Sequence, residues 1–226
     1  MSVYLLINIF IIIIPLIMSF EKKIRFIKKL PAVFLTLFTV GIFFIAWDIN
    51  ATEKGDWSFN PEFVSGLKIA GLPYEEILFF ITVPYSILFI YESLRHYLNE
   101  RTYDINRMLL LTGMIIFATA SYYFIDLNYT SNVMTAMLIV LLVALLSGRT
   151  FGITNVLLIT LLVSFIPFII VNYFLTSLPV LIYNPVAITG IRFITIPVED
   201  FFYSFSMISA WLMVYSLLIK SKLLNK

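Results

Sequence analysis

Long apolar runs separated by short polar segments dominate the chain. Seven of these runs are each about long enough to cross a hydrocarbon core of roughly 30 Å. They cover residues 3–20, 31–47, 76–94, 107–125, 132–147, 153–175 and 198–219. The first run lacks a preceding basic segment and a small-residue cleavage site, so we expect a retained span rather than a signal peptide. The pattern predicts an all-α membrane protein with about seven transmembrane helices.

Composition supports this prediction. Of the 226 residues, 61% are hydrophobic and 12% are charged, which is more apolar surface than a soluble domain of this length can bury. The formal charge of +2 gives no reason to expect a nucleic-acid partner. The chain has no cysteine, which excludes disulfides and thiolate metal sites, and its single histidine, His96, argues against a histidine-based metal centre.

The basic residues predict the orientation of the chain in the membrane. Twelve of the 15 follow the first, third, fifth and last spans, which places them on one side, whereas Lys54, Lys68 and Arg192 fall on the other. Cytoplasmic loops carry the excess of Lys and Arg, so we expect a cell-membrane protein with its N-terminus outside and its C-terminus in the cytoplasm. The twelve are Lys22, Lys23, Arg25, Lys28, Lys29, Arg95, Arg101, Arg107, Arg149, Lys220, Lys222 and Lys226.

The acidic residues show the opposite bias, since nine of the 13 lie on the predicted outer side. A long solvated loop explains Glu53, Asp56 and Glu62. It does not explain five acids that abut or enter apolar spans, where ionised groups are expensive. These five are candidate functional residues: Asp48, Glu75, Glu76, Glu199 and Asp200.

An internal repeat connects the acids. "FNPEFVSGLKIAGLPYEEILFF" aligns without gaps to "YNPVAITGIRFITIPVEDFFYS" at an offset of 124 residues. The same offset places Asn172 opposite Asp48. The pairs are Asn60 with Asn184, Pro61 with Pro185, Gly66 with Gly190, Lys68 with Arg192, Pro73 with Pro197, Glu75 with Glu199, and Glu76 with Asp200.

The repeat predicts the organisation of the chain. Two three-helix units, residues 1–94 and 132–226, are joined by a connector, residues 95–131, that includes the fourth span. Because three spans reverse the direction of the chain, a fourth is needed to give both units the same orientation. The repeats are therefore expected to be parallel, with both acid pairs on one membrane face.

Two interpretations of the acid pairs remain open. Each pair follows a proline in a first helical turn, where carboxylates gain from the helix dipole and could serve only as caps. Alternatively, burial and neighbouring like charges keep some of the acids protonated, so that the pairs supply a general acid and a general base. Aromatic side chains around them could stabilise a cation. The substrate contacts we expect are Trp47, Trp57, Phe79, Phe80, Asn172, Phe202 and Tyr203.

These residues resemble a known family. "AWD", "WSFNPEFVSGLKIAGLPYEEILFF" and "NPVAITGIRFITIPVEDFFYS" look like the two repeats of the small integral-membrane lycopene cyclases, the heterodimer type of β-cyclase, here fused in one chain. The resemblance implies acid/base cyclisation of the linear ψ-ends of lycopene to β-ionone rings, through a carbocation and without net redox change. It implies Glu75 and Glu199 as the central acid/base residues, supported by Glu76 and Asp200, with Asp48 next. The second repeat departs from the first at Asn172 and has no counterpart of Trp57.

The remaining expectations concern partners and rival functions. No cofactor is evident, and the substrate is expected to be a lipophilic carotenoid that enters from the bilayer. A homo-oligomer or contact with other carotenoid enzymes stays open. Lys68 and Arg192 could pair with the acids or lie at the interface. The alternatives are a carotenoid hydratase, a proton-coupled transporter and a passive carotenoid scaffold.

Overall fold

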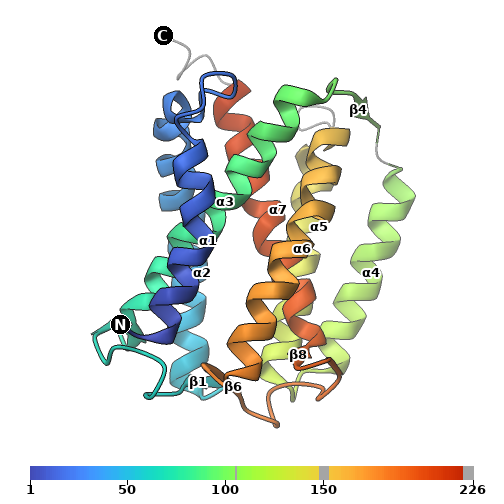
Figure 1. The fold of residues 1–226 in the computed structure, drawn as a ribbon. Helices are drawn as coiled ribbons and strands as arrows, with labels where there is room; N and C mark the ends of the chain where they lie inside the picture. Colours follow the sequence, from blue (N-terminus) through green and yellow to red (C-terminus); the bar gives the residue numbers. More distant parts are fainter. Residues whose placement is uncertain (105, 148–152, 221–226) are drawn as a thin grey trace.

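The computed structural model describes residues 1–104, 106–147 and 153–220, so Arg149, Lys222 and Lys226 lie outside the described part. Seven α-helices in these ranges run side by side as a bundle (Figure 1). A short 3-10 helix, η1 (Phe26–Lys29), leads into the second of them. The helices are α1 (Val3–Met18), α2 (Leu30–Lys54), α3 (Tyr74–Tyr97), α4 (Arg107–Tyr123), α5 (Asn128–Ser147), α6 (Asn155–Ser177) and α7 (Val198–Lys220).

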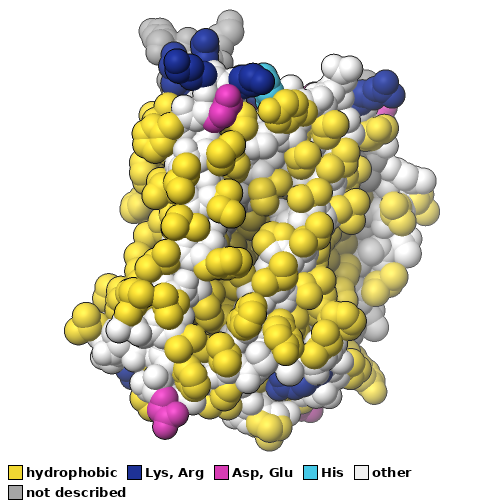
Figure 2. Space-filling model, in the orientation of Figure 1, with side chains coloured by type: hydrophobic (Ala, Val, Ile, Leu, Met, Phe, Trp, Pro, Cys, Tyr) yellow, Lys and Arg dark blue, Asp and Glu magenta, His cyan; other side chains and the backbone are white. Residues whose placement is uncertain are grey.

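The bundle has the surface of a membrane protein. Figure 2 shows hydrophobic side chains over its sides and charged side chains gathered at its two ends. Of the described helices, α2 with η1, α3, α5, α6 and α7 are long and apolar enough to cross a membrane. Helices α1 and α4 are apolar but shorter, with 16 and 17 residues. The protein is therefore a mostly helical membrane protein, and seven crossings remain a prediction.

Short antiparallel strand pairs connect the helices, which the hydropathy pattern did not predict. β1 (Trp57–Phe59) pairs with β6 (Leu181–Tyr183), and β4 (Thr102–Tyr103) pairs with β5 (Ile153–Thr154). Two hairpins, β2 (Lys68–Ile69) with β3 (Leu72–Pro73) and β7 (Arg192–Phe193) with β8 (Ile196–Pro197), lead directly into α3 and α7. Strands of two or three residues are too short to show a period of two in the sequence.

Helices α3 and α7 form the centre of the bundle. They pack against each other, and the fully buried Trp211 and Leu88 belong to their shared core. Helix α1 packs on α3 and α5 packs on α7, while α2 crosses to α7 and α6 crosses to α3. Hydrogen bonds within the apolar interior support the α1–α3 contact, because Asn8 Nδ2 donates to the Glu75 carbonyl at 3.0 Å and Thr82 Oγ1 donates to Asn8 Oδ1 at 2.8 Å.

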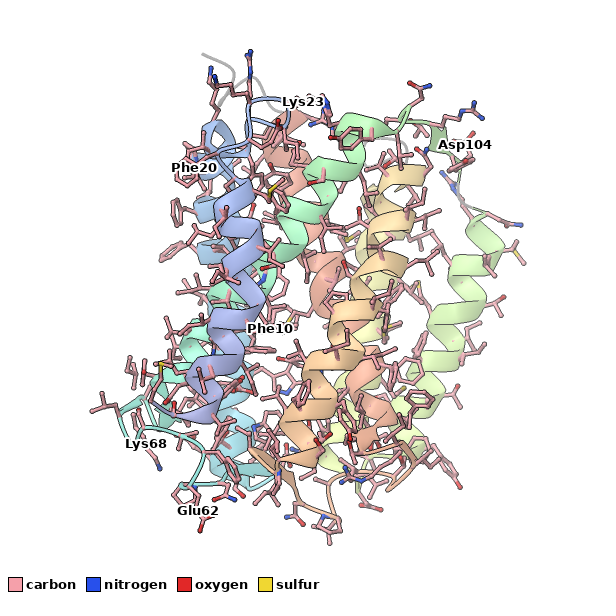
Figure 3. All side chains as sticks on the ribbon, in the orientation of Figure 1. Phe10, Phe20, Lys23, Glu62, Lys68 and Asp104 are labelled. Atoms are coloured by element: carbon pink, nitrogen blue, oxygen red, sulfur yellow. The ribbon has the colours of Figure 1, made fainter. Side chains whose placement is uncertain are left out.

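Both central helices begin at the same end of the bundle. The β1–β6 ladder and the β7–β8 hairpin lie at that end, as do the labelled Glu62 and Lys68 (Figures 1 and 3). Lys23 and Asp104 mark the opposite end (Figure 3). The N-termini of α3 and α7, with their four acids, are therefore brought together at one face.

Candidate active site

The two hairpins position the acid pairs in the first turns of α3 and α7. Pro73 precedes α3 with φ −54° and ψ 140°, a conformation that proline favours and that starts the helix at Tyr74. All four acids that follow are buried: Glu75, Glu76, Glu199 and Asp200. Carboxylates here gain from the positive end of the helix dipole. Burial among apolar side chains goes beyond what a surface cap requires.

The first acid of each pair binds the loop before its helix. Glu75 Oε1 accepts hydrogen bonds of 2.7 Å from the Ser65 N–H and from Ser2 Oγ. Glu199 Oε1 accepts bonds from the Thr189 N–H and Thr189 Oγ1 at 2.7 and 2.8 Å, and from Thr130 Oγ1 at 2.7 Å. Each of these carboxylates thus ties a loop to the start of a neighbouring helix, α1 or α5. Neither lines the main cavity.

The second acid of each pair faces that cavity. Glu76 Oε2 accepts a hydrogen bond from the Tyr4 hydroxyl of α1. Asp200 Oδ1 accepts one from the Tyr129 hydroxyl of α5 at 2.8 Å, and both Asp200 oxygens lie within 2.9 Å of the Tyr183 hydroxyl. These tyrosine donors stabilise carboxylates that have been taken out of water.

Asp48 is a third carboxylate on the cavity wall. It lies near the end of α2, is buried, and its Oδ2 atom has no hydrogen-bond partner. Its counterpart in the sequence repeat, Asn172 of α6, also lines the cavity, and its amide donates to the Phe168 carbonyl at 3.2 Å. The cavity wall therefore has a carboxyl group on α2 and an amide group at the matching position on α6.

The cavity itself is apolar and has a volume of about 340 Å³, within the usual range for small-molecule sites. It lies among α1, α3, α6 and α7, and the acids occupy the end formed by the first turns of α3 and α7. Five expected substrate contacts line it: Trp57, Phe79, Phe80, Asn172 and Tyr203. An apolar hollow with three carboxylates at one end suits acid/base chemistry on a hydrocarbon.

Comparison with known families decides the identity. The family model described as lycopene cyclase matches residues 1–94 and 126–218. The chain belongs to the lycopene cyclase family. The two matched segments contain every carboxylate of the site. No curated protein and no solved structure matches the chain.

Two expected substrate contacts of this lycopene cyclase lie behind the cavity wall. Trp47 packs against Phe44 and Tyr203, with ring centroids 6.0 and 5.1 Å apart. Phe202 packs against Phe117 of α4 at 6.0 Å. Both are aromatic residues close to the acids in the sequence. Their positions around the helix axis point them at aromatic rings of neighbouring helices. Neither lines the cavity.

The three tyrosines that bind the cyclase carboxylates, Tyr4, Tyr129 and Tyr183, are not among the residues that the sequence predicts for the site. The ungapped offset of 124 pairs Tyr4 with Asn128, one residue short of Tyr129, so the shared role was hidden. Tyr183 enters from β6. Burial and the neighbouring Asp200 carboxylate raise its pKa well above the ordinary tyrosine value, so Tyr183 stays a hydrogen-bond donor.

Among the described residues, no salt bridge joins the matched bases of the repeat, Lys68 and Arg192, to the acids. Arg192 donates to the Thr195 carbonyl at 2.6 Å, and its guanidinium lies 5.9 Å from the centre of the Tyr183 ring. Lys68 is exposed on β2. Within the described ranges, the salt bridges of this cyclase join Glu92 to Lys29 and Arg95, and Arg95 to Glu100, at the other end of the bundle.

Proposed function

We propose that the protein is a lycopene β-cyclase that converts the linear ψ-ends of lycopene to β-ionone rings by way of a one-ring intermediate. The observation that carries this proposal is the convergence of Asp48, Glu76 and Asp200 on one end of an apolar cavity. The reaction needs an acid, a base and a pocket that shields a carbocation from water. Family membership supports lycopene cyclase activity in general, and the β-specific outcome is our proposal.

The reaction is an isomerisation in which one proton is added and one is removed. An acid donates a proton to C2 of the terminal alkene and leaves a tertiary cation at C1. The electron pair of the C5=C6 double bond forms the C1–C6 bond and moves the cation to C5. A base then removes the proton from C6, and that electron pair restores the C5=C6 double bond. No electrons are gained or lost, so the chemistry calls for no redox cofactor.

We assign Asp48 as the proton donor. It is buried, its Oδ2 has no hydrogen-bond partner, and the ionised form would have no donor to stabilise it there. Glu76 faces the same cavity, but its Oε2 atom accepts a hydrogen bond from Tyr4, whereas Asp48 keeps an unbonded oxygen. A proton on Asp48 is therefore available to the substrate alkene.

We assign Asp200 as the base. The Tyr129 and Tyr183 hydroxyls both donate to it, which fixes its oxygen atoms as acceptors on the cavity wall. This differs from the central role expected for Glu75 and Glu199, which bind loop N–H and hydroxyl groups instead. Aromatic faces of Trp57, Phe79 and Tyr203 on the cavity wall would stabilise the cation between the two proton transfers.

We also propose the parallel two-repeat organisation, with units 1–94 and 132–226 and a connector 95–131. Matched backbone bonds support it. The Asn60 N–H donates to the Val180 carbonyl at 3.0 Å, and the Asn184 N–H donates to the Asp56 carbonyl at 2.9 Å. With the offset of 124, Asn60 corresponds to Asn184 and Asp56 corresponds to Val180, so each bond is the counterpart of the other in the repeat.

For localisation we propose a cell-membrane protein whose site lies near the outer face. The basic cluster around η1 occupies the end opposite the acids, as the positive-inside rule requires. An oligomer or a contact with other carotenoid enzymes remains a prediction.

Expression in a lycopene-accumulating bacterium tests the function by pigment analysis. Formation of β-carotene by the wild type, with loss of rings in the Asp48→Asn variant, supports the proposal. Unchanged lycopene despite good membrane expression overturns it. A hydroxylated product would select a hydratase, in which water captures the same C1 cation, whereas the apolar lining of the cavity favours the exclusion of water.

A further inference from the structure

The wall of the cavity is open on one side. Four of its lining residues are also exposed on the outside of the bundle: Phe10 and Ile14 of α1, at 65% each, and Ile166 and Ile170 of α6, at 63% and 43%. The lining residues of α3 and α7 on the opposite wall, such as Phe80, Ser204 and Ile208, are buried. Side chains that face the cavity and the surface together mark an opening along the α1–α6 seam.

The seam is closed near the acids and open beyond them. Close to the acid end, Tyr4 of α1 packs with Val171 and Leu175 of α6. Further along α1, Phe10 lies on the side that faces α6 (Figure 3), and it both lines the cavity and is exposed on the outside of the bundle. On a helical bundle covered by apolar side chains, this opening faces the hydrocarbon region of the membrane rather than water.

The cavity holds only part of a long linear molecule. Its lining positions extend furthest on α3, from Glu76 to Ile90, which is about 21 Å at roughly 1.5 Å per residue. That is about two thirds of a hydrocarbon core of roughly 30 Å. The carboxylates are found at one end alone, so one substrate end group can reach them at a time.

We infer that the α1–α6 seam is the lateral entry for the substrate, and that the conjugated chain extends through it into the bilayer while one ψ-end reacts. This inference rests on the proposed cyclase function. The two ends then react in separate binding events. Because the chain emerges through the seam, the one-ring intermediate leaves into the lipid and enters again with its other end first.

The absence of cysteine makes a direct test practical. The Phe10→Cys, Ile166→Cys double variant is joined across the seam with a bifunctional maleimide whose linker contains a cleavable disulfide. A matched pair, Ile115→Cys with Ile139→Cys, is joined on α4 and α5, which also pack together, and neither residue lines the cavity. Ring formation from lycopene is measured in membranes before crosslinking, after it, and after reduction of the linker.

We expect crosslinking of the seam to lower ring formation at least tenfold and reduction to restore it, while the control pair changes little. Equal rates before and after complete crosslinking of the seam overturn the inference. A wild-type protein that forms no rings at all overturns the proposed function instead, so the two failures are distinguishable. As a second variant, Ile170→Trp narrows the seam and is expected to raise the ratio of one-ring to two-ring product. An unchanged ratio and rate would contradict the lateral route.

Discussion

Ser58 and Ile182 lie opposite each other at the centre of the β1–β6 ladder, and they are 124 residues apart in the sequence. The ladder also pairs Trp57 with Tyr183 and Phe59 with Leu181. The same offset relates these two pairs, because Trp57 corresponds to Leu181 and Phe59 corresponds to Tyr183. An antiparallel ladder centred on two equivalent residues has a local two-fold relationship. Trp57 and Tyr183, from opposite sides of the ladder, both reach the cavity wall. The ladder thus joins the two halves of the chain directly beside the carboxylates.

The two adjacent acids of α3 are expected to respond differently to the same substitution. Glu76→Gln should lower ring formation by about 100-fold, because it alters the carboxylate that faces the substrate beside Asp48. Glu75→Gln keeps an oxygen acceptor for Ser65 and Ser2, so most of the activity should remain, with a lower thermal midpoint. Initial rates and thermal unfolding of the purified variants separate the two effects. Equal loss of activity in both would contradict the assignment.

Tyr183→Phe removes one of the two tyrosine donors to Asp200 while leaving the ring in place. A hydrogen bond to a charged group contributes about 1.5–3 kcal/mol, so we expect the rate to fall by about tenfold or more. Tyr97→Phe is the matched control, because Tyr97 is exposed at the other end of the bundle. Kinetics of ring formation measure the difference. A Tyr183→Phe enzyme as fast as this control would show that the bond does not serve catalysis.

Glu92 is expected to matter for stability alone. Its buried carboxylate accepts a hydrogen bond from the Tyr215 hydroxyl at 2.9 Å and pairs with Lys29, far from the acid end of the cavity. Glu92→Ala leaves these groups without their acceptor and should lower the free energy of unfolding by about 1–3 kcal/mol. Glu92→Gln, which retains an acceptor, should lose less. Unfolding in denaturant checks the order, and a catalytic defect per folded molecule would argue against a purely structural role.

The β7–β8 hairpin contains strain that a glycine should relieve. Ile194 has a φ of 60°, a conformation that β-branched residues disfavour, and its side chain is largely exposed. We expect Ile194→Gly to stabilise the protein by up to about 1 kcal/mol after the entropy of glycine is counted. Ile191→Gly is the control, since Ile191 is equally exposed but has no positive φ. Stabilisation by both variants, or by neither, in thermal unfolding would disprove the strain argument.

Asp56, in the loop that follows α2, predicts a pH dependence of the stability of the protein. Burial raises the pKa of this carboxyl, and the hydrogen bond from Asn128 offsets the rise only in part. The folded protein therefore binds the proton more tightly than the unfolded chain, so the contribution of Asp56 is favourable at low pH and is lost as the pH rises through its folded pKa.

Asp56→Asn removes this dependence. The thermal midpoint of the variant relative to wild type should increase from about pH 4 towards neutrality. Midpoints measured across that range provide the test, with Glu62→Gln as an exposed control in the same loop. A difference that decreases with rising pH would reverse the sign of the argument.

The sequence by itself determined the helical membrane character, the family and the pairing of the acids. Apolar runs of membrane-crossing length and special residues repeated at a fixed spacing are local features, which need no knowledge of packing. Of the seven substrate contacts expected from the sequence, five line the cavity, and their contact with a substrate stays a prediction.

Only the tertiary structure decided which acid of each pair faces the cavity. Adjacent residues on an α-helix point about 100° apart, so Glu75 turns to its loop while Glu76 turns to the cavity, and the sequence cannot choose between them. The tyrosine donors come from α1, α5 and β6, which are distant in the chain and meet the carboxylates only when the helices pack. The open α1–α6 seam likewise exists only between two helices, since neither helix contains it alone.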